Sequence, residues 1–117
     1  MAVVTAGNTF VGVSGWGWLT GSRLLGRHQH PLTYLASHLD AIEIPDTFEE
    51  ALKPEVTRLW LRKISEQAQF QFTAKLHRRF THDRILDRDE ITRFKDGLWP
   101  LLRAGRMGCL LMQFPWS

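Results

Sequence analysis

The sequence is poor in cysteine and has no long hydrophobic run, and both absences narrow the kind of protein it encodes. Cys109 is the single cysteine among 117 residues, so the chain cannot form an intramolecular disulfide. Its apolar neighbours, with no adjacent histidine, predict a small buried thiol rather than a nucleophile. No segment approaches the roughly 20 consecutive apolar residues of a membrane helix, and residues 1–7 lack the basic region of a secretory signal. We therefore expect a soluble, cytoplasmic protein without membrane contacts.

The composition is that of a globular protein, with 44% hydrophobic and 23% charged residues. At this length a chain buries roughly two-thirds of its unfolded surface, so a core forms without a metal or a disulfide. We expect a single domain over residues 1–117. The formal net charge of +3 permits an anionic partner without requiring one. The sequence indicates no particular cofactor.

Apolar periodicity predicts strands and helices that alternate along the chain. The predicted strands lie at residues 9–14, 41–44, 70–75 and 108–114. Helices are predicted behind Pro31 and Pro54, which suit a first helical turn, and behind Asp87, which with Glu90 resembles a capping box. Pro100 is expected to end or kink the last helix. The order is β-α-β-α-β-α-β, with a strand about every 30 residues, which predicts a parallel sheet.

Side-chain alternation favours a barrel over an open doubly wound sheet. Each strand is expected to point one polar residue away from the helices near its C-terminal end, namely Ser14, Glu43, Lys75 and Gln113. A doubly wound sheet favours apolar residues on both faces, whereas the active sites of β/α barrels lie at the C-terminal strand ends. The sequence thus predicts an α/β fold, a partial (β/α)8 TIM-type barrel truncated after its fourth strand.

Four segments taken together resemble a known family. They are VGVSGW at residues 11–16, IEIPDTF at 42–48, FTAK at 72–75 with Thr81 and His82, and LLMQFPWS at 110–117. Their order and spacing are similar to those of the YecE-like family, also called domain of unknown function 72. The resemblance implies a TIM-type barrel without an established activity, and a truncated one, because a whole barrel takes roughly 250 residues. Pro45 and Glu49 stand where the family usually has asparagine and tyrosine.

Glu43 and Lys75 are the first candidates for catalysis. Both head groups are expected inside the barrel mouth, where a carboxylate and an ammonium can act as acid and base. The alternative, which we favour, is a structural ion pair, because an unpaired buried charge is costly. His82 is the third catalytic candidate, since the family-like Thr-His pair follows a strand end, and Gln113 is a candidate for orienting substrate.

Basic and aromatic residues supply candidate binding groups. Arg78 and Arg79 follow the third strand within a basic cluster, and a guanidinium matches the oxygens of a phosphorylated ligand or a nucleic-acid backbone. Interspersed acidic residues also fit an ordinary solvated surface. Ser14 and Trp16 are candidates for contact with substrate, although the ring is equally suited to packing. His28 and His30 form an H-x-H pair with no third ligand nearby, so no metal site is predicted.

Three functional interpretations remain open at this stage. The parent protein is expected to be a barrel enzyme that acts on a small polar or phosphorylated substrate. The alternative is a protein that binds phosphate or a nucleic-acid backbone. The chain alone is expected to be an inactive half-barrel. Residues 108–114 carry no charge and no proline, so we expect self-association through exposed strand edges.

Overall fold

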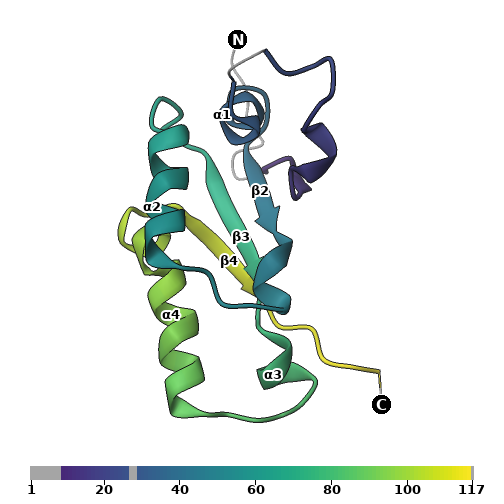
Figure 1. Cartoon of the computed structure of the whole chain (residues 1–117), viewed down its shortest axis with the longest axis vertical. Helices are drawn as coiled ribbons and strands as arrows, with labels where there is room; N and C mark the ends of the chain where they lie inside the picture. Colours follow the sequence, from purple (N-terminus) through teal and green to yellow (C-terminus); the bar gives the residue numbers. More distant parts are fainter. Residues whose placement is uncertain (1–8, 27–28, 117) are drawn as a thin grey trace.

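The computed structural model describes residues 9–26 and 29–116, which form a parallel sheet and its connecting helices (Figure 1). The strands are β1 (Gly12–Ser14), β2 (Ala41–Ile44), β3 (Gln71–Lys75) and β4 (Met107–Leu111). The longer helices are α1 (Pro31–Ala36), α2 (Pro54–Lys63) and α4 (Arg88–Arg103). The short helices η1 (Gly17–Leu19), η2 (Pro45–Phe48) and α3 (Arg78–Thr81) lie in the loops after β1, β2 and β3. None of the described helices is long and apolar enough to cross a membrane.

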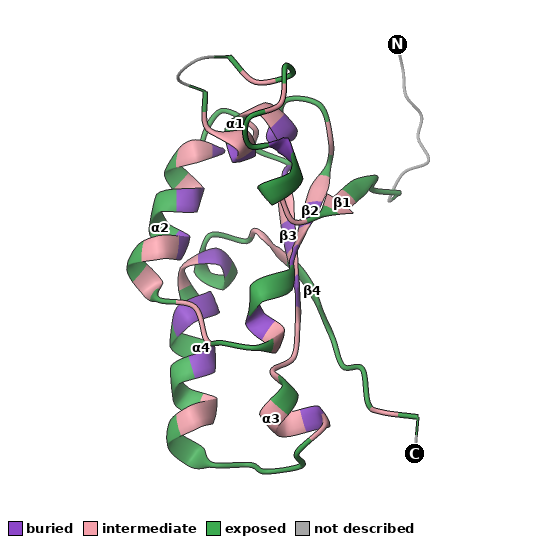
Figure 2. Ribbon diagram, turned by 45° about the vertical axis from the view of Figure 1, so that its right-hand side comes forward, coloured by how far each residue is buried: buried purple, intermediate pink, exposed green. Residues whose placement is uncertain are grey.

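The four strands run parallel and lie side by side in chain order, β1-β2-β3-β4. Helices α1, α2 and α4 lie on one side of this sheet, and no described helix covers the other side (Figure 2). The predicted alternation of strands and helices is therefore confirmed. The result is an α/β fold consistent with part of a β/α barrel, in which helices cover only the outer face of the strands.

The alternation of side chains along β2 and β3 decides which face the helices cover. The residues of these strands that point to the helices are all buried: Ile42, Ile44, Phe72 and Ala74. Trp60 of α2 stacks on Phe72, with ring centroids 6.1 Å apart. The residues between them, which point the other way, stay partly exposed. We call the face without helices the inner face, as it would be in a barrel.

Helix α4 differs from its prediction at its C-terminal end. Asp87 caps the helix as expected, its carboxylate accepting the Glu90 amide at 3.0 Å. Pro100 does not end the helix, which continues to Arg103. Leu98 and Leu101 are buried on either side of the proline. Their packing holds the last turn in place although proline cannot donate its helical hydrogen bond.

Strand β4 is shorter than the predicted strand 108–114. Its last bond with β3 in the described residues runs from the Leu76 amide to the Leu111 carbonyl, at 2.9 Å. Because β3 ends there, residues 112–116 have no strand beside them and extend away from the sheet without regular structure (Figure 1). Gln113 therefore lies outside the sheet.

Helix α4 approaches the segment just before α2 so closely that one residue at the contact must be glycine. A Cβ atom at Gly97 would overlap the carbonyl group of Leu52, with the carbonyl carbon only 2.8 Å away. At the same contact, the buried hydroxyl of Thr57 donates a hydrogen bond of 2.8 Å to the Gly97 carbonyl. The position of α4 is thus set by the backbone before α2 and by the Thr57 hydrogen bond as well as by apolar side chains.

We predict that Gly97→Ala lowers the free energy of unfolding by at least about 1 kcal/mol. Alanine favours a helix over glycine by about 1 kcal/mol, but overpacking costs up to about 3 kcal/mol, and the upper part of that range applies here because the carbonyl of Leu52 cannot rotate away as a side chain could. Urea unfolding followed by circular dichroism measures the change. Gly17→Ala is the matched control, because no atom lies within 4 Å of its Cβ position. A Gly97→Ala protein as stable as the parent would contradict this close helix contact.

Candidate functional site

A row of polar side chains crosses the inner face of the sheet. The strand register places Ser14 beside Glu43, Glu43 beside Thr73, and Thr73 beside Cys109. The Ser14 hydroxyl donates a hydrogen bond of 2.7 Å to the Glu43 carboxylate. Ser14, Glu43 and Thr73 line a shallow hollow over β1, β2 and β3, with Gly12 at its edge. We call these four residues, Ser14, Glu43, Thr73 and Cys109, the inner row.

The prediction that Glu43 and Lys75 form an ion pair is wrong. No ion pair of the described residues includes either side chain. The register explains this difference, because Thr73 stands beside Glu43 while Lys75 lies two residues further along β3, opposite Leu111. The ammonium of Lys75 lies over the ring of Phe48, 6.0 Å from its centroid, at the outer limit of a cation–π contact.

Helix η2 holds this phenylalanine at the C-terminal end of β3. The Thr47 side chain is fully buried, and its hydroxyl both donates to the Lys75 carbonyl at 2.8 Å and accepts from the Lys75 amide at 3.1 Å. Phe48 also meets the ring of His82 edge-on, with centroids 5.1 Å apart. Two predicted catalytic residues, Lys75 and His82, therefore contact the same aromatic ring.

A family comparison covers nearly all of this structure. The family described as protein of unknown function DUF72 matches residues 10–117. The chain belongs to the DUF72 family. Neither the curated proteins nor the solved structures compared with the chain give a significant match. The resemblance found in the sequence motifs is thus confirmed for the family, which carries no assigned function.

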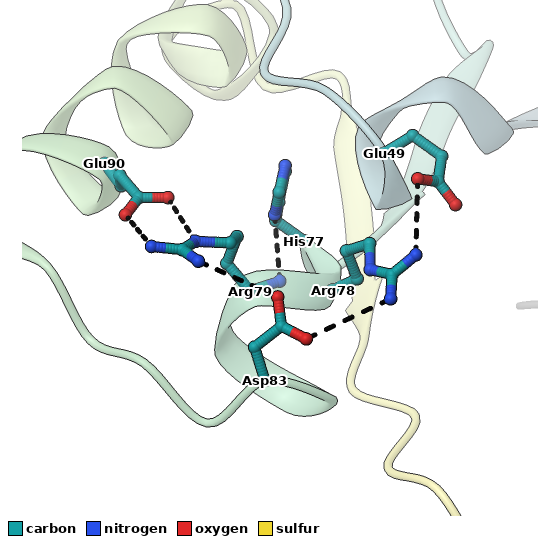
Figure 3. A network of polar contacts seen from close by, with 6 residues as sticks. All are labelled: Glu49, His77, Arg78, Arg79, Asp83 and Glu90. Carbon is teal, nitrogen blue, oxygen red and sulfur yellow. Dashed lines mark hydrogen bonds and ion pairs between the residues drawn. The ribbon is translucent and has the colours of Figure 1, made fainter.

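In this DUF72 chain the two arginines of the predicted phosphate site already bind carboxylates (Figure 3). Arg79 donates two hydrogen bonds to Glu90, of 2.9 and 2.8 Å. Arg78 lies 3.7 Å from Glu49 and 4.0 Å from Asp83. The hydrogen bonds with Glu90 raise the pKa of Arg79, and they lower the pKa of the Glu90 carboxyl. We call the turn after β3 that contains Arg78 and Arg79 the basic turn. Its positive charge is therefore offset by acidic side chains from three parts of the chain.

The histidines near this turn and near α1 act as helix caps in the DUF72 chain. His77 Nδ1 accepts the Arg79 amide at 3.0 Å, and His30 Nδ1 accepts the Leu32 amide at 3.0 Å. Burial, followed by the nearby charge of Lys63, lowers the pKa of His30, which favours the neutral ring that a cap requires. His28 lies outside the described residues. Within those residues no group of three metal-ligating side chains is found.

The remaining candidates lie apart from the inner row. Trp16 packs edge-on against Trp60 of α2, with ring centroids 5.0 Å apart, so its ring belongs to the packing on the helix side. Gln113 is exposed in the segment after β4. Cys109 is exposed rather than buried, because no described strand lies beyond β4.

Sequence reasoning missed three residues that organise the site. Thr73 completes the inner row between Glu43 and Cys109, and its strand parity was the available signal. Thr47 and Phe48 stand in the family-like segment 42–48, but no pattern in that segment indicates that they bind the end of β3. Such contacts depend on how the loop after β2 folds back over its neighbour.

We predict that Glu90→Gln destabilises the protein at neutral pH and that this difference fades in acid. The pKa of Glu90 is lowered in the folded state, so its pairing with Arg79 stabilises the fold above the ordinary carboxyl pKa near 4.5 and is lost as pH falls through the lowered value. Urea midpoints of parent and variant at neutral pH and below about pH 4 measure this. Glu66→Gln, at an exposed carboxylate, is the control. Equal midpoints at neutral pH would show that the pair contributes nothing.

Proposed function

We propose that this chain carries half of the substrate site of a β/α-barrel enzyme that acts on a small polar or phosphorylated molecule. The observation that supports this proposal is the hydrogen bond between Ser14 and Glu43 on the inner face, next to Thr73. In β/α barrels, polar residues at the C-terminal strand ends form the active site, and residues elsewhere in the barrel are apolar. In the inner row, Ser14 is the last residue of β1 and Glu43 the last but one of β2, and both carry polar side chains.

Glu43, Lys75 and His82 are the proposed catalytic groups, with Ser14 binding substrate beside Glu43. The Glu43 carboxylate already accepts a hydrogen bond from a hydroxyl, with the two oxygens 2.7 Å apart. It can therefore accept a hydrogen bond from a substrate hydroxyl instead and act as a general base. Lys75, which forms no ion pair in the described residues, can meet a phosphate or a developing negative charge. Gln113 and Trp16 are proposed only as binding groups at the margin of the site, since neither lies in the inner row.

The same geometry supports the proposal that the chain is inactive by itself. The four described strands cover one side of the site, and Ser14 is exposed on the edge strand. Catalysis by acid and base groups depends on a site that excludes water and orients its substrate. An open inner face supplies neither condition.

The alternative proposal is that the basic turn binds phosphate or a nucleic-acid backbone. Arg78 is nearly half exposed and its ion pairs are long, at 3.7 and 4.0 Å, so a phosphate could replace them. Arg79 supports this less well, because a ligand would have to displace its paired hydrogen bonds to Glu90. We therefore propose Lys75 as the residue that meets a phosphate group in the main proposal, and Arg78 in the alternative.

We predict that glycerol 3-phosphate, used as a probe, binds weakly at Lys75 and the inner row. Amide NMR signals of Ser14, Glu43 and Lys75 should shift on titration, with a dissociation constant in the millimolar range. Lys75→Gln should weaken binding about fivefold, the loss of about 1 kcal/mol, because it removes the unpaired cation. Arg78→Gln is the matched control, and glycerol controls for the phosphate group.

The outcomes of this titration separate the two proposals. Shifts confined to residues 78–83 and abolished by Arg78→Gln would favour the alternative, and an oligonucleotide should then bind with a strong dependence on salt. The absence of shifts at the inner row would contradict the main proposal.

We also propose that the chain self-associates through its exposed strand edges. Leu110, Leu111 and Met112, in and directly after β4, are all exposed. We predict that size-exclusion chromatography with light scattering shows a mass that rises with protein concentration. A monomer over the whole range would contradict this, because an uncovered apolar edge favours pairing.

A further inference from the structure

Another cavity lies apart from the inner row, between residues 49–54 and helices α3 and α4. Its volume is about 470 Å³, which is within the size range of sites for small molecules. Residues 49–54 form one wall, α3 with the residue before it forms a second, and α4 forms a third. These walls belong to two neighbouring β-α units, β2 with α2 and β3 with α4, which both lie within the described residues. We call this space the outer cavity, because α2 and α4 lie on the helix side of the sheet.

His77 presents a hydrogen-bond donor to the outer cavity, and its ring is held in place by the backbone. Its Nδ1 atom accepts the Arg79 amide at 3.0 Å, so the proton of the neutral ring is carried by Nε2. Figure 3 shows Nε2 at the end of the ring that points away from α3. No hydrogen bond between described residues uses this atom, and the ring lines the cavity. A ligand can therefore accept a hydrogen bond from Nε2 without displacing a protein group.

The wall next to this donor is aromatic. Phe80 and Phe94 meet edge to face, with ring centroids 5.7 Å apart. The ring of His77 lies 5.7 Å from that of Phe80 and 6.5 Å from that of Phe94. Phe94 is buried in the core and the other two rings are half-buried, so the three rings form a rigid apolar surface with one polar atom. Such a surface favours a ligand with an apolar body.

The charged residues around the outer cavity include both signs. Two of them, Glu49 and Glu90, are already engaged with Arg78 and Arg79. The others form no ion pair among the described residues, and they are two carboxylates and two cations: Glu50, Asp96, Lys53 and Arg93. A ligand with only a negative charge would lie close to the free carboxylates, and one with only a positive charge would lie close to the free cations. A ligand with both charges meets a partner for each.

We propose that the outer cavity binds a small zwitterion with an apolar side chain, of the class of the apolar α-amino acids. The carboxylate of the ligand accepts the hydrogen bond from His77 Nε2 and lies near Arg93. Its ammonium group meets Asp96, three residues along the same helix from Arg93. Its side chain packs on Phe80 and Phe94. This site does not rest on the proposed function, because it shares no residue with the inner row.

The experiment compares L-leucine with two analogues that each lack one of its charges. 4-Methylpentanoate keeps the carboxylate and the side chain, and isoamylamine keeps the ammonium group and the side chain. Each is titrated at neutral pH into the full chain, and the amide NMR signals of His77, Phe80, Arg93 and Asp96 are followed. We expect leucine to bind with a dissociation constant in the millimolar range. Each analogue should bind about fivefold more weakly, which is the upper end for one partly exposed ion pair.

Two variants assign the two ends of the ligand. Asp96→Asn should weaken leucine binding about threefold and leave 4-methylpentanoate unchanged, because it removes only the partner of the ammonium group. His77→Asn should weaken both ligands, since asparagine can still cap α3 but is too short to place a donor where Nε2 lies. Asp89→Asn is the matched control, because Asp89 is on the same helix and does not line the cavity. Circular dichroism verifies that each variant folds.

The other outcomes overturn the inference in distinguishable ways. If 4-methylpentanoate binds as tightly as leucine, the cavity is an anion site, and if isoamylamine does so, it is a cation site. Leucine binding that Asp96→Asn leaves unchanged also contradicts the zwitterion. The absence of shifts at the outer cavity with all three ligands refutes the site outright. None of these results affects the titration of the inner row with glycerol 3-phosphate, so the proposed function is tested separately.

Discussion

The alternation of apolar and polar side chains on β2 and β3 is the constraint on which the rest of the structure depends. Phe72 and its neighbours on the helix side are buried against α2 and α4, and this packing leaves Glu43, Thr73 and Lys75 on the opposite face. A slip of one residue would exchange the two sets and bury charges against the helices. The position of the candidate site is therefore a consequence of core packing. The chemistry of the site comes from polar residues, which are too costly to bury in the core.

A second level of organisation comes from the loop after β2. Pro45, which departs from the family pattern, begins η2, and the buried hydroxyl of Thr47 ties this helix to both backbone groups of Lys75. Phe48 then contacts Lys75 and His82. The lysine is thus positioned by its own main chain and by an aromatic ring, where the sequence suggested a carboxylate. Glu49, the other departure, is used in the ion pair with Arg78.

The distribution of charge explains why a basic sequence does not produce a basic site. The turn after β3 is rich in arginine, but Glu90 from α4 and Glu49 from the end of η2 meet its guanidinium groups. The inner row, in contrast, carries one carboxylate with a hydroxyl partner and no ion pair in the described residues. Polar groups that are not engaged with one another are the ones available to a ligand.

The sequence by itself determined the order of strands and helices, the parallel sheet, the cap at Asp87 and the face on which Glu43 lies. These features follow from local patterns, because strand parity, helix caps and βαβ spacing act over a few neighbouring residues. Tertiary structure alone decided that Glu43 bonds Ser14 instead of Lys75, that Trp16 packs on Trp60, and that α4 continues past Pro100. Each of these depends on the register between strands or on the packing of one element against another. Residues far apart in the chain set both, and no local pattern encodes them.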